Sequence, residues 1–224
     1  MNAFKLTFFD LTQSFPLAAK ILFQNMGLLR TVQVFILFGL KKITFRPFKA
    51  LPKTKPLGRA EALTRHQLLP VLLLDAIFKT HLKIEPTQSL SILKQIVSQS
   101  GALFIQYAVQ NPSPAAWHQM DTKAKNHFAT RSLQQFFNAE THVVQAPQAS
   151  FGFNVSLCHF VTLTTALGRS DLAPLFCAAD EVLFDRPELH IIMKRDETLA
   201  QGHSQCAFRF QWDSDSKTSD APIK

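Results

Sequence analysis

The 224-residue sequence has few cysteines, glycines and acidic residues, and each shortage excludes a class of protein. Its three cysteines are an odd number and lie far apart, so they do not form the disulfide framework of a small secreted domain. Its seven glycines are scattered, and no glycine-rich phosphate-binding loop is present. The cysteine pattern indicates a reducing, cytoplasmic location with free thiols.

Acidic residues are scarce chiefly in the first third of the chain. Residues 1–66 contain eleven Lys or Arg against only Asp10 and Glu61, so the whole net charge of +8 lies there. A basic segment of this kind can meet nucleic acid, anionic lipid or an acidic partner. Because no readable nucleic-acid recognition module accompanies it, nucleic acid is not expected as a partner.

No apolar run reaches the ~20 residues that a membrane-spanning helix needs. The most apolar stretch, residues 26–40, is interrupted by Arg30 and Gln33, and the N-terminus does not read as a cleaved signal. The following "KKITFRPFK" alternates cations with aromatic residues. We expect a core helix followed by a solvated basic loop. The alternative is peripheral contact of residues 28–59 with the inner face of the membrane.

The order of elements predicts an α+β protein, with a helical N-terminal half followed by a small, mainly antiparallel sheet with two short helices. Helices are expected at 15–26, starting at Ser14 and ending at Gly27, at 59–82 with a kink or a split at Pro70, at 87–99 with Thr87 as N-cap, and at 122–138. Residues 28–40 read as a helix or a buried strand. Residues 1–58 are predicted as an N-terminal segment and linker, 59–213 as one domain, and 214–224 as a disordered tail.

The stretch "FNVSLCHF", residues 153–160, carries polar groups in what reads as a β-strand. Because successive strand residues point to opposite faces, Asn154, Ser156 and Cys158 are predicted to share one face. An amide, a hydroxyl and a thiol in one row indicate that this face lines a pocket.

Two further stretches carry reactive groups. In "CAAD", Cys177 and Asp180 are three residues apart, which places them on one helix face. In "GHSQCAFRF", Cys206 alternates with aromatic residues along one strand face, with Arg209 on the other.

These blocks together resemble the L-2-amino-thiazoline-4-carboxylic acid hydrolase family. The resemblance rests on "FNVSLC", "LGRSDLAPLFCAAD" and "RDETLAQGHSQCAFRF", which occur in the family's order across residues 151–212. The family often has an acidic residue between the last Cys and Phe, where this chain has Ala207. The resemblance implies a hydrolase that opens a cyclic amidine-type ring of a small-molecule substrate, on a bacterial route to cysteine.

The matching motif positions imply the site residues. These are Asn154, Cys158, Cys177, Asp180, Gly202 and Cys206. We expect Asp180 as general acid or base, and Cys177, then Cys158, as candidate nucleophile. Asn154 would donate a hydrogen bond to the charge that develops on the substrate. Arg195, Gly202 and Cys206 would bind the substrate, and the guanidinium of Arg195 would pair with the substrate carboxylate.

Simpler interpretations stay open at this point. A free cysteine is often inert core packing, and the pocket could serve a non-catalytic ligand-binding or sensing domain. No cofactor is expected. Zinc is not favoured because the chain lacks the close Cys-x-x-Cys pairing typical of such sites.

Overall fold

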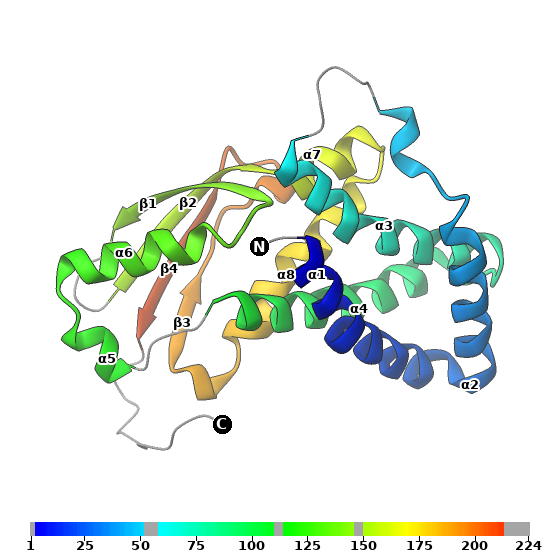
Figure 1. Ribbon diagram of the computed structural model, residues 1–224, viewed down its shortest axis with the longest axis horizontal. Coiled ribbons are helices and arrows are strands. Elements are labelled where there is room, and N and C mark those ends of the chain that lie inside the picture. Colours follow the sequence, from blue (N-terminus) through cyan, green and yellow to red (C-terminus); the bar gives the residue numbers. More distant parts are fainter. Residues whose placement is uncertain (1–2, 52–57, 110–113, 146–149, 213–224) are drawn as a thin grey trace.

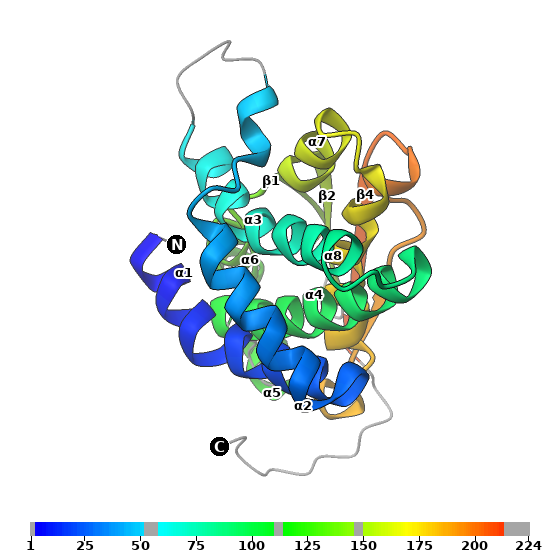
Figure 2. The ribbon, with the colours of Figure 1, turned by 90° about the vertical axis from the view of Figure 1, so that its right-hand side faces the viewer.

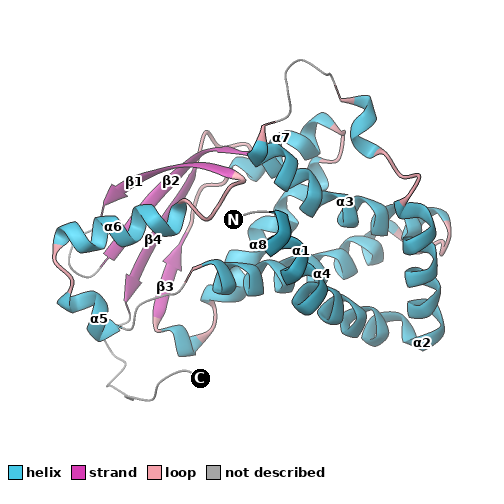
Figure 3. Cartoon of the chain, in the orientation of Figure 1, coloured by secondary structure: helices cyan, strands magenta, loops and turns pink. Residues whose placement is uncertain are grey.

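The computed structural model describes residues 3–51, 58–109, 114–145 and 150–212, with the long helices gathered on one side and the sheet on the other (Figure 1, Figure 3). The expected tail at 214–224 and the middle of the expected linker, residues 52–57, lie outside the described residues. The helical first half and the later antiparallel sheet confirm the α+β prediction.

The N-terminal helices form one long, bent arm. Helix α1 (Ala3–Phe9) continues through a π-helical turn (Asp10–Ser14) into α2 (Phe15–Lys42). Gly27 has φ 77° inside α2, a left-handed value that glycine adopts without steric cost. The predicted break at Gly27 is confirmed, and residues 28–40 are helical. The expectation of a helix start near Ser14 is wrong, because the chain is already helical from Ala3.

Helices α3 (Arg59–Thr80) and α4 (Pro86–Ala108) form the centre of the helical layer, after a short 3₁₀ turn (Pro47–Ala50). Pro70 lies inside α3 without splitting it. The N-cap of α4 is Glu85 and not Thr87, and the apolar stretch after Gly101 continues the same helix.

The helical core joins the N-terminal arm to the rest of the chain. Leu22 and Val34 of α2 are completely buried with Leu68 and Phe78 of α3 and Leu93 of α4. Figure 2 shows the arm running across α3 and α4. The arm therefore has one face packed in the core.

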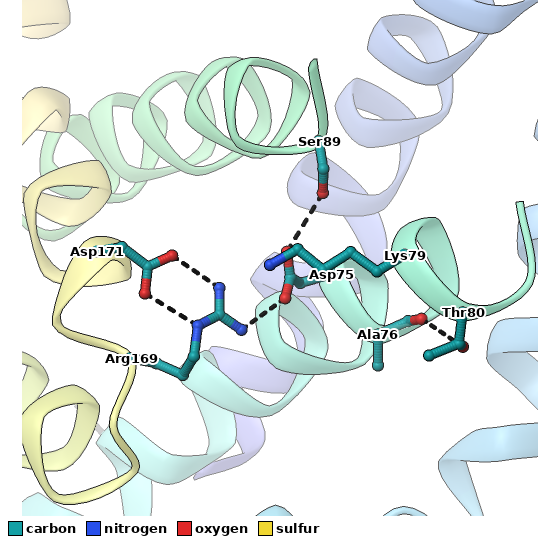
Figure 4. A network of polar contacts seen from close by, with 7 residues as sticks. All are labelled: Asp75, Ala76, Lys79, Thr80, Ser89, Arg169 and Asp171. Carbon is teal, nitrogen blue, oxygen red and sulfur yellow. Dashed lines mark hydrogen bonds and ion pairs between the residues drawn. The ribbon is translucent and has the colours of Figure 1, made fainter. Parts of the chain in front are cut away.

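A buried ion-pair network ties α3 to later segments (Figure 4). The side chain of Asp75 is 4% exposed; it lies 2.5 Å from Arg169 Nη1 and 3.0 Å from Lys79 Nζ, and accepts from Ser89 Oγ at 3.2 Å. Arg169 also donates twice to Asp171. The helix that follows begins at Ala173 with Leu172 as N-cap, and no side chain caps it.

The sheet has the strand order β1-β2-β4-β3, with every neighbouring pair antiparallel. Its strands are β1 (Ala139–Gln145), β2 (Ser150–Cys158), β3 (Ile191–Lys194) and β4 (Cys206–Trp212). Helices α5 (Pro114–Gln119) and α6 (Thr122–Leu133) precede it, and α7 (His159–Ala166) and α8 (Ala173–Phe184) lie between β2 and β3. Short 3₁₀ turns span Ser170–Leu172, Pro187–Leu189 and Leu199–Gln201.

The helical arm is longer than its sequence predicted. The continuous helical stretch Phe4–Lys42 has 39 residues and, by length and composition alone, could cross a membrane. The sequence did not predict a helix of this length, because its most apolar run covers only residues 26–40. The core helix of a soluble protein or a signal sequence would satisfy the same criterion, so length and composition alone do not identify a membrane-spanning helix.

Candidate functional site

A β-bulge in β2 decides which side chains reach the site. In the pairing with β1, Val155 lies opposite Thr141 and Leu157 opposite Glu140, so Ser156 is an extra residue on β2. A bulge of this kind shifts the inside–outside alternation by one residue. Cys158 therefore joins Phe153 and Val155 on the inner face, where all three line the same cavity.

The predicted row of Asn154, Ser156 and Cys158 is wrong for the same reason. Asn154 is not among the residues that line the cavity. Its amide donates to Gln205 Oε1 at 2.8 Å and accepts from Arg209 Nη1 at 2.9 Å, while Ser156 is exposed. The structure thus places Asn154 on the outer face of the sheet.

Helix α8 supplies the carboxyl group of the inner site. Cys177 and Asp180 are three residues apart in α8 and both line the cavity, as their spacing predicts. Phe184, one turn further on, packs edge-on against Phe210 of β4 with ring centroids 4.9 Å apart. Packing of α8 on the sheet therefore aims this helix face at the strands.

Arg195, just after β3, is anchored on α8. Its Nη1 donates to Asp180 Oδ2 at 2.5 Å, and its Nη2 donates to Glu181 Oε1 at 2.8 Å and to the Cys177 carbonyl at 3.1 Å. The side chain is only 5% exposed, and its guanidinium lies 5.2 Å from the centre of the Phe208 ring. Its Nε is buried and has no hydrogen-bond partner among the described residues.

A single cavity of about 520 Å³ joins these groups. Cys158, Cys177 and Cys206 all line it, together with Asp180 and Arg195. Three segments that are distant in the sequence thus bring their sulfur atoms and one carboxyl group to a common space.

Two residues were predicted for the site from the stretch "GHSQCAFRF", and only Cys206 lines the cavity. Cys206 is buried, and the backbone N–H of Leu199 donates to its Sγ at 3.2 Å. Gly202 ends a 3₁₀ turn with φ 91° and does not line the cavity. Its left-handed backbone explains why the motif has glycine there, because other residues adopt this conformation only with strain.

The family assignment agrees with this geometry. The sequence profile of the L-2-amino-thiazoline-4-carboxylic acid hydrolase family matches residues 89–210, more than half of the chain. The protein belongs to this family. The match begins in α4 and ends in β4, so it contains Cys158, Cys177, Asp180, Arg195 and Cys206.

Other comparisons add little to the family assignment. No curated protein matches the sequence. Among solved structures, an H-NOX protein from S. oneidensis in the Fe(II)NO ligation state matches with 12% identity. The alignment covers 89% of this chain and 97% of that chain with a TM-score of 0.35, a value that does not establish a common fold.

Burial keeps the thiols of this family member protonated. Loss of solvent raises the pKa of Cys177 to about 12, although the nearby Arg195 opposes the rise. Burial likewise raises the pKa of Cys158 and of Cys206. Nucleophilic cysteines have lowered pKa values, so these three are neutral thiols in the unliganded site.

The Asp180 carboxyl group titrates close to neutral pH. Burial raises its pKa to about 6, and Glu181 adds to the rise, while the ion pair with Arg195 lowers it. A carboxyl group in this range can exchange protons with a substrate at physiological pH.

An aromatic wall faces these polar groups, and sequence reasoning found only part of it. Phe153 and Phe208 lie opposite each other on β2 and β4 and stack with ring centroids 4.7 Å apart. Phe151 and Phe210 form the next pair at 6.0 Å, and Trp117 of α5 meets Phe151 edge-on. The alternation in β4 indicated Phe208 and Phe210, but nothing local indicated Trp117.

Metal-ligating side chains are not clustered in the described part of the chain. Within the described ranges, no group of three or more His, Cys, Asp or Glu side chains is placed to hold a metal ion.

Proposed function

We propose that the protein is a hydrolase that opens a small cyclic amidine or thiazoline carboxylate. The observation that carries the proposal is the paired Asp180 and Arg195 at the polar end of an otherwise largely apolar cavity. Membership in the hydrolase family supports the reaction class. The substrate and the role of each residue belong to the proposal.

Arg195 is proposed to bind the substrate carboxylate. A buried N–H without an acceptor is costly, so such a group calls for a partner. Arg195 Nε is such a donor, while the two terminal nitrogens hold Asp180 and Glu181. A carboxylate that accepts from Nε would complete the hydrogen bonding of the guanidinium and orient the ring beside Asp180.

Asp180 is proposed to move the proton. Ionised Asp180 accepts a proton from water, and the water oxygen bonds to the carbon between the ring nitrogen and sulfur. The carbon–sulfur or carbon–nitrogen bond then breaks, and the proton passes from Asp180 to the leaving heteroatom. This step adds one water in total and needs no cofactor.

The thiols are proposed to shape the cavity beside the reacting carbon. Cys177 remains the first candidate for a covalent nucleophile, with Cys158 the second, but either thiol must first lose its proton to a base. Asp180, on the same face of α8 as Cys177, is the nearest carboxyl group in sequence for that purpose. Direct attack by water avoids this step.

The test is a ring-opening assay with L-2-amino-thiazoline-4-carboxylate and a panel of cyclic amidines, with the products read by mass spectrometry. We expect a product heavier by one water, its loss in Asp180→Asn, and its retention in the control Ser156→Ala, whose hydroxyl is exposed on the bulge. Saturable binding of the panel without product would instead support a sensing or ligand-binding domain. A covalent adduct on Cys177 in a quenched reaction would replace water attack by thiol attack.

A further inference from the structure

The outward face of the second limb of the N-terminal helical arm, residues 28–43, is apolar. Five exposed apolar residues recur there every three or four positions, which keeps them on one helix face: Leu29, Val32, Ile36, Leu40 and Ile43. In the first limb Phe4, Phe8, Leu11 and Phe15 are also exposed, but the helix face of Phe15 continues into Leu22, which is completely buried. Single exposed apolar residues are common in soluble proteins, but a stripe of five on one helix face, from Leu29 to Ile43, marks an interaction surface.

Cations flank this stripe. Arg30 follows Leu29, and Lys41 follows Leu40, so each lies about 100° around the helix from the stripe. Both are exposed. Across residues 3–51 the sequence has seven Lys or Arg and a single acidic residue, Asp10, whose carboxylate lies 3.1 Å from His66 Nε2. The arm therefore carries a strong net positive charge, with Arg30 and Lys41 beside the stripe.

The opposite face of the second limb is fixed in the protein. Thr31 and Val34 are buried on that face, and Thr31 Oγ1 donates to the Gly27 carbonyl at 2.8 Å. Ile21 and Leu22 hold the first limb in the core with α3 and α4. To cross a bilayer, the arm would have to leave this core and expose that face. Lying flat leaves the core intact and buries only the stripe.

We propose that the second limb of α2, residues 28–43, binds the surface of an anionic phospholipid bilayer, with the apolar stripe in the interface and the flanking cations on the headgroups. An apolar face bordered by Lys and Arg is the pattern of interfacial helices. Long basic side chains bury their methylenes and keep the charge at headgroup level.

The cavity lies on the other side of this limb. Phe35, Phe38 and Lys42 line the cavity that contains Asp180 and Arg195, on the side of the helix away from the stripe. The proposal does not depend on the reaction catalysed, since the stripe and its cations lie outside the family match.

The test is flotation of the full-length protein with vesicles of phosphatidylcholine, with and without phosphatidylglycerol, at low and high salt. We expect flotation only with the anionic vesicles and its loss at high salt. Arg30→Gln with Lys41→Gln should weaken partitioning by about fivefold for each cation removed. Leu29→Gln and Ile36→Gln, at side chains 87% and 58% exposed, should each weaken it by about tenfold.

Matched controls separate docking from general surface effects. Lys123→Gln on α6 and Ile192→Gln on β3 change exposed residues of the same kinds outside the arm and should leave flotation unchanged. Thermal unfolding checks that each variant is folded.

Three results would overturn the proposal. The first is equal partitioning of the variants and the wild type, which would remove the stripe from any membrane role. The second is resistance of the bound protein to alkaline carbonate, which would mean a spanning helix. The third is a dimer in sedimentation that dissociates in Leu29→Gln, which would assign the stripe to a second copy of the chain.

Discussion

Gly101 of α4 lies directly against Ala179 of α8, so that a Cβ on Gly101 would be 2.5 Å from the Cβ of Ala179. No real pair of Cβ atoms is so close, and neither backbone can move without disturbing the core. Ala179 precedes Asp180, so the absence of a side chain at position 101 sets how deeply α8 sits beside the cavity.

Gly101→Ala should therefore destabilise the protein and impair the site. Overpacking of a rigid contact costs about 1–3 kcal/mol, against the gain of about 1 kcal/mol that Ala normally brings to a helix interior. We expect a lower midpoint in denaturant and a lower kcat, because α8 must shift. Gly39→Ala in α2, where nothing lies within 4 Å of the added methyl, is the control and should stabilise.

A compensating change makes this prediction specific. Ala179→Gly removes the methyl that Gly101→Ala would strike, so the double variant should be less destabilised than the two single variants added together. Strictly additive losses of stability would show that the side chains at positions 101 and 179 do not interact.

Acid titration of Asp180 should control the rate. If ionised Asp180 is the base, kcat/KM should be constant above pH 6 and fall about tenfold per unit below it, because the ionised fraction is lost as pH falls through the pKa of about 6. Glu181→Gln removes a charge that raises this pKa, so the acid limb should move to lower pH. Arg195→Gln removes a charge that lowers the pKa of Asp180, so the acid limb should move to higher pH.

The pH profile also tests the thiol alternative. If Cys177 attacked as a free thiolate, without Asp180 taking its proton, its pKa near 12 would give a rate that keeps rising above pH 9. A profile of that shape, with no response to Glu181→Gln, would exclude Asp180 as the rate-controlling base.

Local pattern predicted much of the fold because periodicity reports which side is buried. The alternation of Cys206, Phe208 and Phe210 correctly predicted the inner face of β4, and the three-residue spacing of Cys177 and Asp180 correctly put both in one cavity. The length of the N-terminal arm could not be found this way. Gly27 breaks the helix, but the chain resumes it at once, and packing on α3 and α4 stabilises the continuation.

The prediction that Asn154 and Cys158 share one face failed because of a feature without a local signal. One extra residue at Ser156 reverses the alternation of β2, and this bulge depends on the pairing with β1, more than ten residues upstream. The sequence singled out Arg195 but not its partners, because its bonds to Asp180 and Glu181 join segments whose approach only the tertiary fold determines.

Replacement of Arg169 should lower the stability of the protein more than replacement of Asp171, its second partner. Arg169→Gln leaves the buried Asp75 carboxylate with only Lys79 and Ser89, and breaking a buried pair costs about 3–5 kcal/mol. Asp171 is 44% exposed, so Asp171→Asn should cost at most about 1 kcal/mol. Denaturant midpoints measure both, and equal losses would contradict a network centred on Asp75.

The size of the cavity predicts a preference for substrates with an apolar group. At about 520 Å³ it falls in the range of sites that enclose drug-sized ligands, well beyond the needs of a bare thiazoline carboxylate. With the carboxylate on Arg195, a substituent on the ring would extend along Phe153 and Phe208. Each methylene buried there should raise kcat/KM by about fourfold. Val155→Phe, which fills part of that wall, should erase this gain while the unsubstituted ring is still turned over. Faster turnover of the unsubstituted ring than of its alkyl derivatives would contradict this prediction. It would mean that the substrate does not reach the apolar space beside Phe153 and Phe208, because contact with these rings favours the larger apolar ligand.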